Sequence, residues 1–298
     1  MYIRVKEMPD NTNIYIGTSG WSYPKGEGTW TGYFYPIGKI NELEYYSHFF
    51  NTVEVNSSFY RPPNPGYVYN WVKRVPDDFR FTVKLWQKFT HPKMYEEATG
   101  EEAAISQKDV DQFKQSIDPM ANSGKLGALL AQFPPSFKND NYGQQILLAV
   151  IRTFGSYRLA VELRHRSWSD DVGFAQLLQD NNVSWVHIDE PKFQSSIATE
   201  IPLTADMAYF RFHGRNKEMW WKGDSETRYK YLYSPEEINE LANRVKAAGN
   251  KAQLLFAFFN NHWQGYAPRN AVSIMRTLQL PFRELSTQET SPDEDVSE

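Results

Sequence analysis

The sequence predicts an α/β protein, a (β/α)8 barrel of the TIM type in a single domain. Eight short apolar segments alternate along the chain with segments of helical spacing, a pattern typical of parallel strands joined by crossover helices. The length of 298 residues is common for one such barrel. No G-x-G-x-x-G or P-loop sequence follows any expected strand, so a doubly wound open sheet is the second choice.

The expected strands are apolar runs bounded by turn residues. They comprise residues 14–20, 52–60, 80–86, 126–133, 158–165, 183–189, 208–215 and 253–260. The expected helices comprise residues 40–50, 65–74, 106–122, 141–153, 172–180, 235–248 and 269–278. The helix at 235 has the strongest start signal, because Ser234, Pro235 and Glu237 supply an N-cap, a first-turn proline and a capping-box glutamate. Residues 191–206 show no helical pattern.

Composition excludes several classes of site. The chain has no cysteine, which rules out disulfides, thiolate metal sites and a cysteine nucleophile. The start of the sequence lacks the apolar region of a signal peptide, and the longest apolar run, residues 254–259, is far too short to span a bilayer. We therefore expect a cytoplasmic protein without a membrane partner.

The net charge of −4 is unevenly distributed. Residues 285–298 hold five of the 36 acidic residues and no basic one, which leaves 31 acids against 32 bases in residues 1–284. The few apolar groups and like charges of this segment predict a disordered acidic tail behind one domain at 1–284. Net charge thus neither favours nor opposes an anionic ligand.

Polar side chains gather at the carboxyl ends of the expected strands, where the active sites of such barrels lie. Alternation of apolar and polar residues assigns one face of each strand to the helices and the other to the barrel interior. The inward residues by this rule are Glu54, Asn56, Lys84, Glu162, Arg164, His187, Asp189, Arg211, His213 and Arg215, and Gln132, Asn260 and Asn261 end two further strands.

This inward set contains three acids, Glu54, Glu162 and Asp189, against four bases, Lys84, Arg164, Arg211 and Arg215. An uncompensated buried charge costs on the order of several kcal/mol. The surplus base is consistent with an anionic ligand, a further carboxylate nearby or access of solvent.

General acid–base chemistry is the first functional hypothesis. Glu54, Glu162 and Asp189 are the candidate acids and bases, and His213 is the candidate proton carrier. Flanking arginines should keep His213 neutral near pH 7. The candidate substrate-binding residues are Trp21, Asn56, Tyr60, Lys84, His91, Gln132, Arg164, Arg211, Arg215 and Asn260, with His91 in a loop after the third strand. Each residue also has a purely structural interpretation, such as an ion pair between Glu162 and Arg164.

Two alternatives use the same end of the barrel. Oxygen and nitrogen ligands for a divalent metal exist in Glu54, Glu162, His187, Asp189 and His213, although no tight metal-binding spacing supports them. Nucleic-acid or glycan binding would use the aromatic residues after the first strand, Trp21, Tyr23, Trp30, Phe34 and Tyr35, and those after the seventh, Trp220, Trp221, Tyr229, Tyr231 and Tyr233. Residues 216–228 have the composition of a lid.

Several ordered motifs are similar to those of the YecE-like family, a domain of unknown function (DUF72). They are residues 17–21 (GTSGW), 53–60 (VEVNSSFY), Lys84 with Thr90 and His91, residues 132–135 (QFPP), 162–168 (ELRHRSW), Asp189, residues 211–215 (RFHGR) and Asn260 with Asn261. The resemblance covers about residues 14–278 and implies a TIM-type barrel but no reaction, since the family has no established activity. The family pattern includes His165 and most of the inward set and omits His187, which weakens the metal hypothesis.

The sequence thus predicts an enzyme, hydrolase-like, that acts on an anionic or polyhydroxylated small molecule such as a phosphate ester, without a cofactor. A nucleic-acid-binding protein, a metal-dependent endonuclease or sugar-isomerase barrel, and a non-catalytic binding protein are the alternatives. The sequence indicates no oligomeric state.

Overall fold

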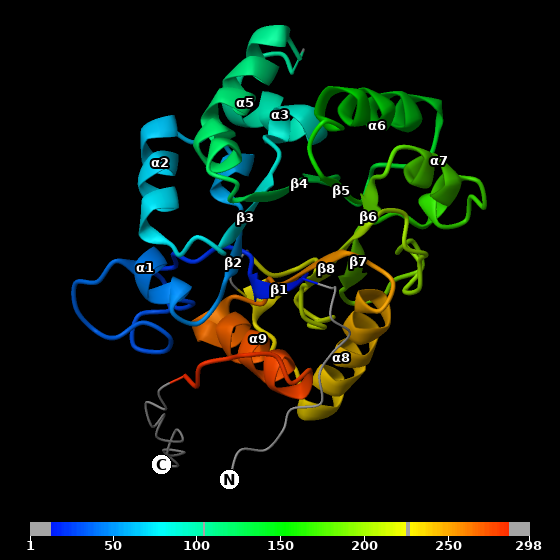
Figure 1. The fold of residues 1–298 in the computed structure, drawn as a ribbon. Helices are drawn as coiled ribbons and strands as arrows, with labels where there is room; N and C mark the ends of the chain where they lie inside the picture. The colour runs from blue at the N-terminus through cyan, green and yellow to red at the C-terminus, as the bar shows by residue number, and fades with distance from the viewer. Residues whose placement is uncertain (1–12, 104, 225–226, 286–298) are drawn as a thin grey trace.

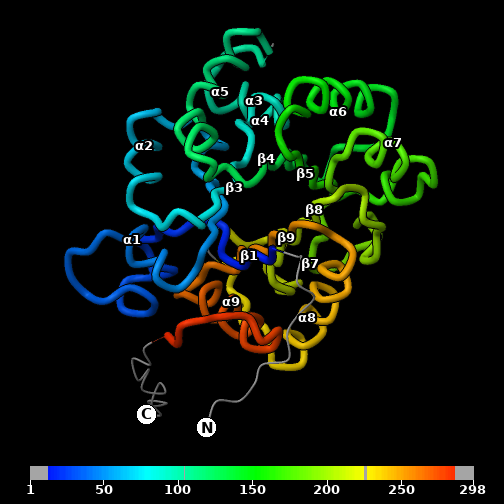
Figure 2. Tube along the Cα trace, in the orientation of Figure 1, coloured from blue at the N-terminus to red at the C-terminus, as the bar shows by residue number. Residues whose placement is uncertain are grey.

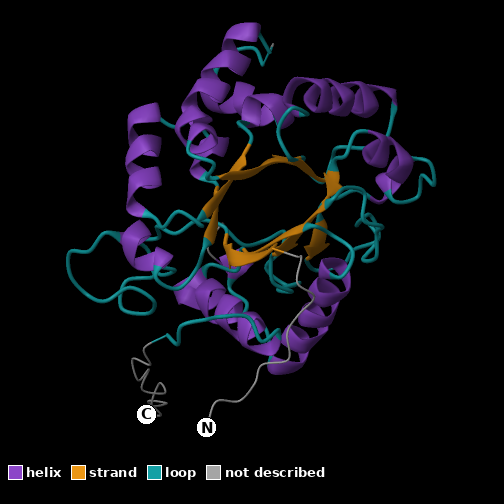
Figure 3. Ribbon diagram, viewed as in Figure 1, coloured by secondary structure: helices purple, strands orange, loops and turns teal. Residues whose placement is uncertain are grey.

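The computed structural model describes residues 13–103, 105–224 and 227–285. Its strands lie in a ring at the centre of the molecule, and the helices pack around the outside (Figures 1 and 3). The first strand lies beside the last one, as the chain trace shows (Figure 2). Leu285 packs against the core, while the rest of the predicted acidic tail lies outside the described residues.

All hydrogen-bonded strand pairs are parallel, which confirms the prediction of an α/β protein. They form a four-stranded sheet of order β1-β9-β8-β7 and a five-stranded sheet of order β2-β3-β4-β5-β6. The strands are β1 (Asn13–Thr18), β2 (Thr52–Val55), β3 (Arg80–Lys84), β4 (Leu126–Gln132), β5 (Leu159–Glu162), β6 (Ser184–Trp185), β7 (His187–Asp189), β8 (Met207–Phe212) and β9 (Leu254–Phe259).

The two sheets meet at two seams. At one seam β6 and β7 follow each other in the chain and are separated by Val186 alone. At the other, Ser19 forms an isolated parallel bridge with Glu54, and the Gly20 amide donates to the Glu54 carbonyl at 2.8 Å. The strand ladders are thus two sheets and not one continuous ladder, so the predicted closed barrel is met only in part.

The seven predicted helices are present. The helices are α1 (Glu42–Ser47), α2 (Pro65–Arg74), α3 (Gln87–Thr90), α4 (Pro92–Thr99), α5 (Gln107–Asn122), α6 (Asn141–Phe154), α7 (Phe174–Asp180), α8 (Pro235–Gly249) and α9 (Tyr266–Thr277), with short 3-10 turns η1 (Ser57–Phe59), η2 (Arg166–Trp168), η3 (Thr227–Tyr229) and η4 (Trp263–Gly265). Ser234 and Glu237 form the expected capping box of α8. The short α3 and α4 were not predicted, and they flank His91 where a long loop was expected.

Aromatic side chains fill the interior of the ring below the strand ends. Tyr209 lies near Phe258 and Phe256, and its hydroxyl contacts Thr82 Oγ1 at 2.9 Å. Gly127 of β4 makes room for this packing, because a Cβ there would lie 2.6 Å from the ring of Phe256. The interior is therefore a packed core, and the cavity described below lies beyond it at the carboxyl ends of the strands.

The face assigned to the sixth predicted strand is wrong. Ile188 pairs in register with Arg211, which points inward, whereas Asp189 pairs with Phe212 on the helix-facing side. His187 likewise stacks on Phe210, with ring centroids 4.7 Å apart. The prediction failed because Val186 and Ile188 are apolar and were assigned to the helices, although an apolar residue also fits the packed interior.

No helix of the described chain is both long enough and apolar enough to cross a lipid bilayer.

Candidate functional site

A cavity of about 490 Å³ opens at the carboxyl ends of the strands. Its lining comes from both sheets, since it includes residues that follow β1, β2, β5, β8 and β9 and the last residues of β3 and β4. Eight of the predicted site residues line it: Trp21, Asn56, Tyr60, Lys84, Gln132, Arg164, Arg211 and Asn260. The prediction that polar groups from separate strands converge here is in accord with this arrangement.

Arg211 is the centre of a buried charge network beneath the cavity. Its Nε and NH2 donate to the two oxygens of Glu54 at 3.0 and 2.7 Å, and its NH1 donates to Glu162 Oε2 at 2.5 Å. Tyr209 donates its hydroxyl to the same Glu54 at 2.7 Å. All three guanidinium nitrogens of Arg211 are therefore occupied by carboxylates, and this pairing offsets the cost of burying the charges away from water.

Arg164 shares Glu162 with Arg211 and holds one further carboxylate, Glu190. It donates from Nε to Glu162 Oε1 at 2.7 Å, and its NH1 lies 3.1 Å from Glu190 Oε2. Burial alone would raise the pKa of Glu162, but Arg164 and Arg211 outweigh it and hold that pKa well below its usual range. Glu162 thus remains ionised and acts as a counter-charge, which makes it a poor proton donor.

Glu190 is a site residue that the sequence interpretation missed. It follows Asp189 directly, so the corrected facing of β7 turns its side chain toward Arg164. Burial raises the pKa of Glu190, and Arg164 opposes that rise in part. With Glu190 included, three acids face Lys84, Arg164 and Arg211, and the surplus of base that favoured an anionic ligand disappears.

His213 lies fully buried between Arg164 and Asn260. Its Nε2 is 3.1 Å from Arg164 NH2, and its Nδ1 is 3.0 Å from the amide of Asn260. Burial first, and then Arg164, lowers the pKa of His213 to about 3. The ring is therefore neutral at pH 7, as predicted, although Arg164 is the main charged cause where Arg211 and Arg215 were expected. Since an arginine only donates, Nε2 accepts from Arg164, and Nδ1 lies next to the amide nitrogen of Asn260.

Lys84 differs from these paired groups. It ends β3, lines the cavity and holds its Nζ 3.8 Å from the centre of the Phe59 ring, and none of the described residues forms an ion pair or hydrogen bond with that Nζ. Burial, followed by the nearby Arg211, lowers the pKa of Lys84 to about 7. An amine that is partly neutral at pH 7 is able to accept a proton or attack an electrophile.

His91 lies just behind Lys84. Its ring packs edge-on against Phe59, with centroids 4.9 Å apart, and its Nδ1 is 2.9 Å from Thr90 Oγ1. Burial and then Lys84 lower the pKa of His91 to about 3. His91 is thus a neutral residue behind the cavity wall and supports Phe59.

Amides and aromatic rings supply the rest of the cavity wall. Asn56 Oδ1 is buried and lacks a hydrogen-bond partner among the described residues. Tyr23 stacks on His262 with centroids 4.7 Å apart, and Tyr229 lies against the same ring at 5.4 Å. Not all the aromatic residues expected at the rim are there, because Trp30, Phe34 and Tyr35 are buried in the core.

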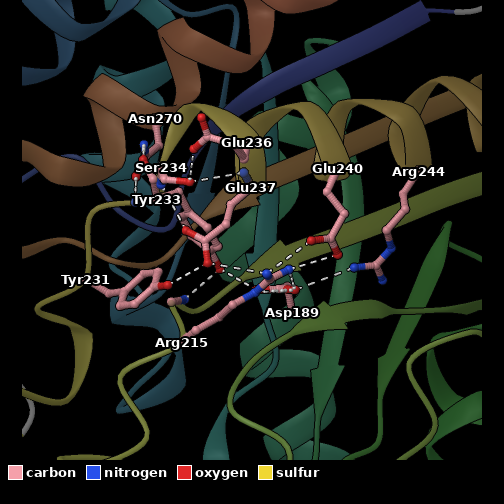
Figure 4. Close-up of polar contacts among 11 residues, drawn as sticks. Asp189, Arg215, Tyr231, Tyr233, Ser234, Glu236, Glu237, Glu240, Arg244 and Asn270 are labelled. Atoms are coloured by element: carbon pink, nitrogen blue, oxygen red, sulfur yellow. Dashed lines mark hydrogen bonds and ion pairs between the residues drawn. The ribbon is translucent and has the colours of Figure 1, made fainter.

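Asp189 and Arg215 form a separate cluster at the start of α8 (Figure 4). Arg215 donates to Asp189 at 2.7 Å from NH2 and reaches Glu237 and Glu240 of α8 at 3.3 and 3.0 Å. The predicted inward facing of Arg215 is wrong because Gly214, at φ 85°, ends the extended backbone of β8. Neither residue lines the cavity.

This cluster joins the two ends of the loop between β8 and α8. Asp189 Oδ1 accepts from Tyr233 Oη at 2.8 Å, and the same Tyr233 oxygen accepts from the Gly214 amide at 2.8 Å. Gly214 and Arg215 begin the loop, Tyr233 ends it, and Tyr229 on it faces the cavity. We call Asp189, Gly214, Arg215 and Tyr233 the loop clamp.

The described residues contain no cluster of three or more histidine or carboxylate side chains with metal-binding geometry. Glu54 and Glu162 are held by guanidinium groups, and His187 and Asp189 face away from the cavity. The metal-ligand set expected as an alternative from the sequence is therefore not assembled.

A family model and curated relatives were compared with this chain. Residues 15–295 match the family described as "Protein of unknown function DUF72". The chain is 30% identical over 285 residues to UPF0759 protein YunF of Bacillus subtilis, covering 92% of this chain and 97% of that protein. It is 32% identical over 158 residues to UPF0759 protein YecE of Escherichia coli K12, covering 51% and 48%.

Solved structures agree with this result. A DUF72 family protein from Thermotoga maritima superposes with a TM-score of 0.77 at 34% identity, covering 89% of this chain and 99% of that chain. A DUF72 family protein from Enterococcus faecalis gives a TM-score of 0.78 at 28% identity, covering 94% and 100%.

Proposed function

Since the chain belongs to the DUF72 family, which is described as being of unknown function, we propose a function from the site itself. The protein is an enzyme that acts on a small polyhydroxylated molecule, and Lys84 transfers a proton during its reaction. The supporting observation is that two polar groups at the cavity have no hydrogen-bond partner among the described residues. They are an amine, Lys84 Nζ, and an amide oxygen, Asn56 Oδ1, beside aromatic rings.

We propose further that the two sheets act as one (β/α)8 barrel of the TIM type. The separation of β6 and β7 by Val186 alone and the bridge from Ser19 to Glu54 support this view. In such barrels the substrate lies at the carboxyl ends of the strands, which is the position of the cavity.

A neutral polyhydroxylated substrate has more support than a phosphate ester. The guanidinium groups of Arg164 and Arg211 are already paired with Glu54, Glu162 and Glu190, so a phosphate would have to displace a carboxylate. Hydroxyl groups need both donors and acceptors, which amides and an amine provide. Sugar rings stack on aromatic side chains, and Trp21, Tyr60 and Tyr229 line the cavity. Hydrolysis of a phosphate ester is therefore the weaker form of the proposal.

Nucleic-acid binding has less support than a small-molecule enzyme. Tyr60 is exposed at the cavity and Trp221 is exposed on the loop before α8, but Trp30, Phe34 and Tyr35 are core residues. Base stacking needs exposed rings along a basic groove. A nucleic-acid binder would show affinity for single-stranded DNA that falls steeply with salt.

A binding screen with a matched variant tests the proposed substrate class. We expect members of a panel of aldoses, ketoses and polyols to bind at millimolar concentration, as measured by saturation-transfer NMR. Asn56→Ala should weaken that binding about tenfold because it removes the unpartnered amide. Asn250→Ala, on the exposed end of α8, is the control and should bind normally. The absence of binding, or equal affinity in both variants, contradicts the proposal.

A further inference from the structure

The lysines that are shielded from solvent differ in whether their ammonium group has a hydrogen-bond or ion-pair partner. Lys88 pairs with Asp109 at 3.1 Å, and Lys125 donates to the carbonyls of Val72 and Val75 at 3.0 and 2.9 Å. Lys192 donates to the Ile197 carbonyl at 3.2 Å. Lys84, in contrast, has a ring face at 3.8 Å and no hydrogen-bond acceptor among the described residues.

Lys84 is placed so that its amine can attack a carbon atom of a molecule bound in the cavity. Its backbone is fixed in β3 by the register of Lys84 with Leu130, and its side chain lines the cavity beside Asn56 and Gln132. A lysine amine becomes a nucleophile when a hydrophobic surface or a nearby cation disfavours its charged form, and both Phe59 and Arg211 are present here.

We propose that Lys84 forms a Schiff base with the aldehyde or ketone group of a hydroxycarbonyl compound, such as an open-chain sugar. This inference rests on the proposed function and adds a covalent step and a carbonyl-bearing substrate class to it. The unpartnered Asn56 amide and the other cavity amides would hold the hydroxyl groups of the same molecule.

The step balances without an oxidant or reductant. The Lys84 nitrogen lone pair attacks the carbonyl carbon, and the carbonyl π electrons move to the oxygen, which takes a proton. The nitrogen then loses a proton, the hydroxyl group takes a proton from solvent and leaves as water, and a carbon–nitrogen double bond remains as an iminium ion. Glu162 and Glu54 favour the positive form at this position, because their charges oppose the lowering of the Lys84 pKa.

The partly neutral state of Lys84 supports this chemistry. Its pKa of about 7 leaves a large amine fraction at neutral pH, whereas an ordinary lysine is almost wholly protonated there. The lysine Lys251, which is exposed, and the buried Lys88, which is ion-paired, provide reference reactivities in the same chain.

Reductive trapping tests the inference on the intact protein. Glyceraldehyde and cyanoborohydride are added at pH 7, and the initial rate of modification of each lysine is mapped by mass spectrometry. We expect Lys84 to react about tenfold faster than Lys251, and Lys88 to remain unmodified. Lys84→Met, checked for folding by circular dichroism, should lose the fast adduct and retain the slow background at Lys251.

A rate at Lys84 no higher than that at Lys251 overturns the Schiff base. If polyols and sugars still bind and Asn56→Ala still weakens them, the proposed function stands and only the covalent step falls. If the panel fails to bind as well, both proposals fall.

Discussion

At the scale of single residues, the site is defined by contrast between groups that are paired and groups that are not. Glu54, Glu162, Arg164 and Arg211 neutralise one another within a buried network. Such groups are counter-charges, because moving a proton onto or off them would leave an opposite charge unpaired. Lys84, by contrast, lines the cavity, has no ion-pair or hydrogen-bond partner in the part of the chain that the structure describes, and has a pKa lowered to about 7.

Lys84 should make the stability of the protein depend on pH. Its folded-state pKa of about 7 lies below the ordinary 10.5, so the unfolded chain binds more protons between these values and stability rises with pH in that window. Below pH 7 Lys84 is charged in both states, and the cost of burying this charge destabilises the folded state by its full amount. We therefore expect Lys84→Met to raise the free energy of unfolding at pH 6 by on the order of 1 kcal/mol or more, with a smaller gain as pH approaches 10.

Urea denaturation at pH 6, 8 and 10 measures this effect. Lys251→Met serves as the control, because Lys251 is exposed and its replacement should cause no gain that depends on pH. If Lys84→Met raises the free energy of unfolding by the same amount at all three pH values, burial does not lower the pKa of Lys84.

At the scale of elements, the loop clamp fixes the segment between β8 and α8. Asp189 accepts from Arg215 and Tyr233, and Arg215 also reaches Glu237 and Glu240 on α8 (Figure 4). The loop carries Tyr229 into the cavity wall, so its position decides the shape of the site. The clamp is therefore a positioning device for Tyr229 and not a catalytic group.

Asp189→Asn should loosen the loop without unfolding the protein. The substitution removes one of the three carboxylate charges that Arg215 pairs with, and charge-assisted bonds are the stronger ones in such clusters. We expect amide hydrogen exchange in residues 214–224 and 227–233 to rise on the order of tenfold, as measured by mass spectrometry. Asp171→Asn, whose carboxylate contacts Asn139 near η2, should leave this loop unchanged. Equal exchange in the two variants would show that the clamp does not hold the loop.

At the scale of the whole molecule, the buried charges join the two sheets. Arg211 belongs to β8 in the four-stranded sheet, while Glu54 and Glu162 belong to β2 and β5 in the five-stranded sheet. These ion pairs cross the interior between sheets whose ladders are separate. The network thus links the two sheets through buried ion pairs.

Arg211→Met should lower the free energy of unfolding of both sheets together. It leaves Glu54 and Glu162 buried without their shared partner, a loss expected to cost roughly 3 to 5 kcal/mol. Urea unfolding followed by circular dichroism and by tryptophan fluorescence should give one coincident transition at a lower midpoint. Arg166→Met, which breaks the exposed pair with Asp170, should leave the midpoint unchanged. Two separated transitions would show that the sheets unfold independently.

Local patterns in the sequence are sufficient to predict the parallel α/β class, the seven main helices and the convergence of Glu54, Lys84, Glu162, Arg211 and His213. Period-two alternation was sufficient where a strand has polar residues on one side and apolar residues on the other, as in residues 52–55. These patterns are local, so they can be read without knowing which strands are neighbours.

The facing of β7 and the partner of each charged group follow from contacts between distant segments and could not be predicted from local patterns. Ile188 is apolar although it faces the interior, so the alternation rule placed Asp189 on the wrong side of the strand. The same error left Glu190 out of the predicted site. The turn at Gly214 sent Arg215 to α8 instead of the cavity. Pairing between segments far apart in the chain depends on register and on backbone turns, which no local pattern contains. This pairing gives Arg164 and Arg211 their carboxylates and leaves Lys84 without a partner among the described residues.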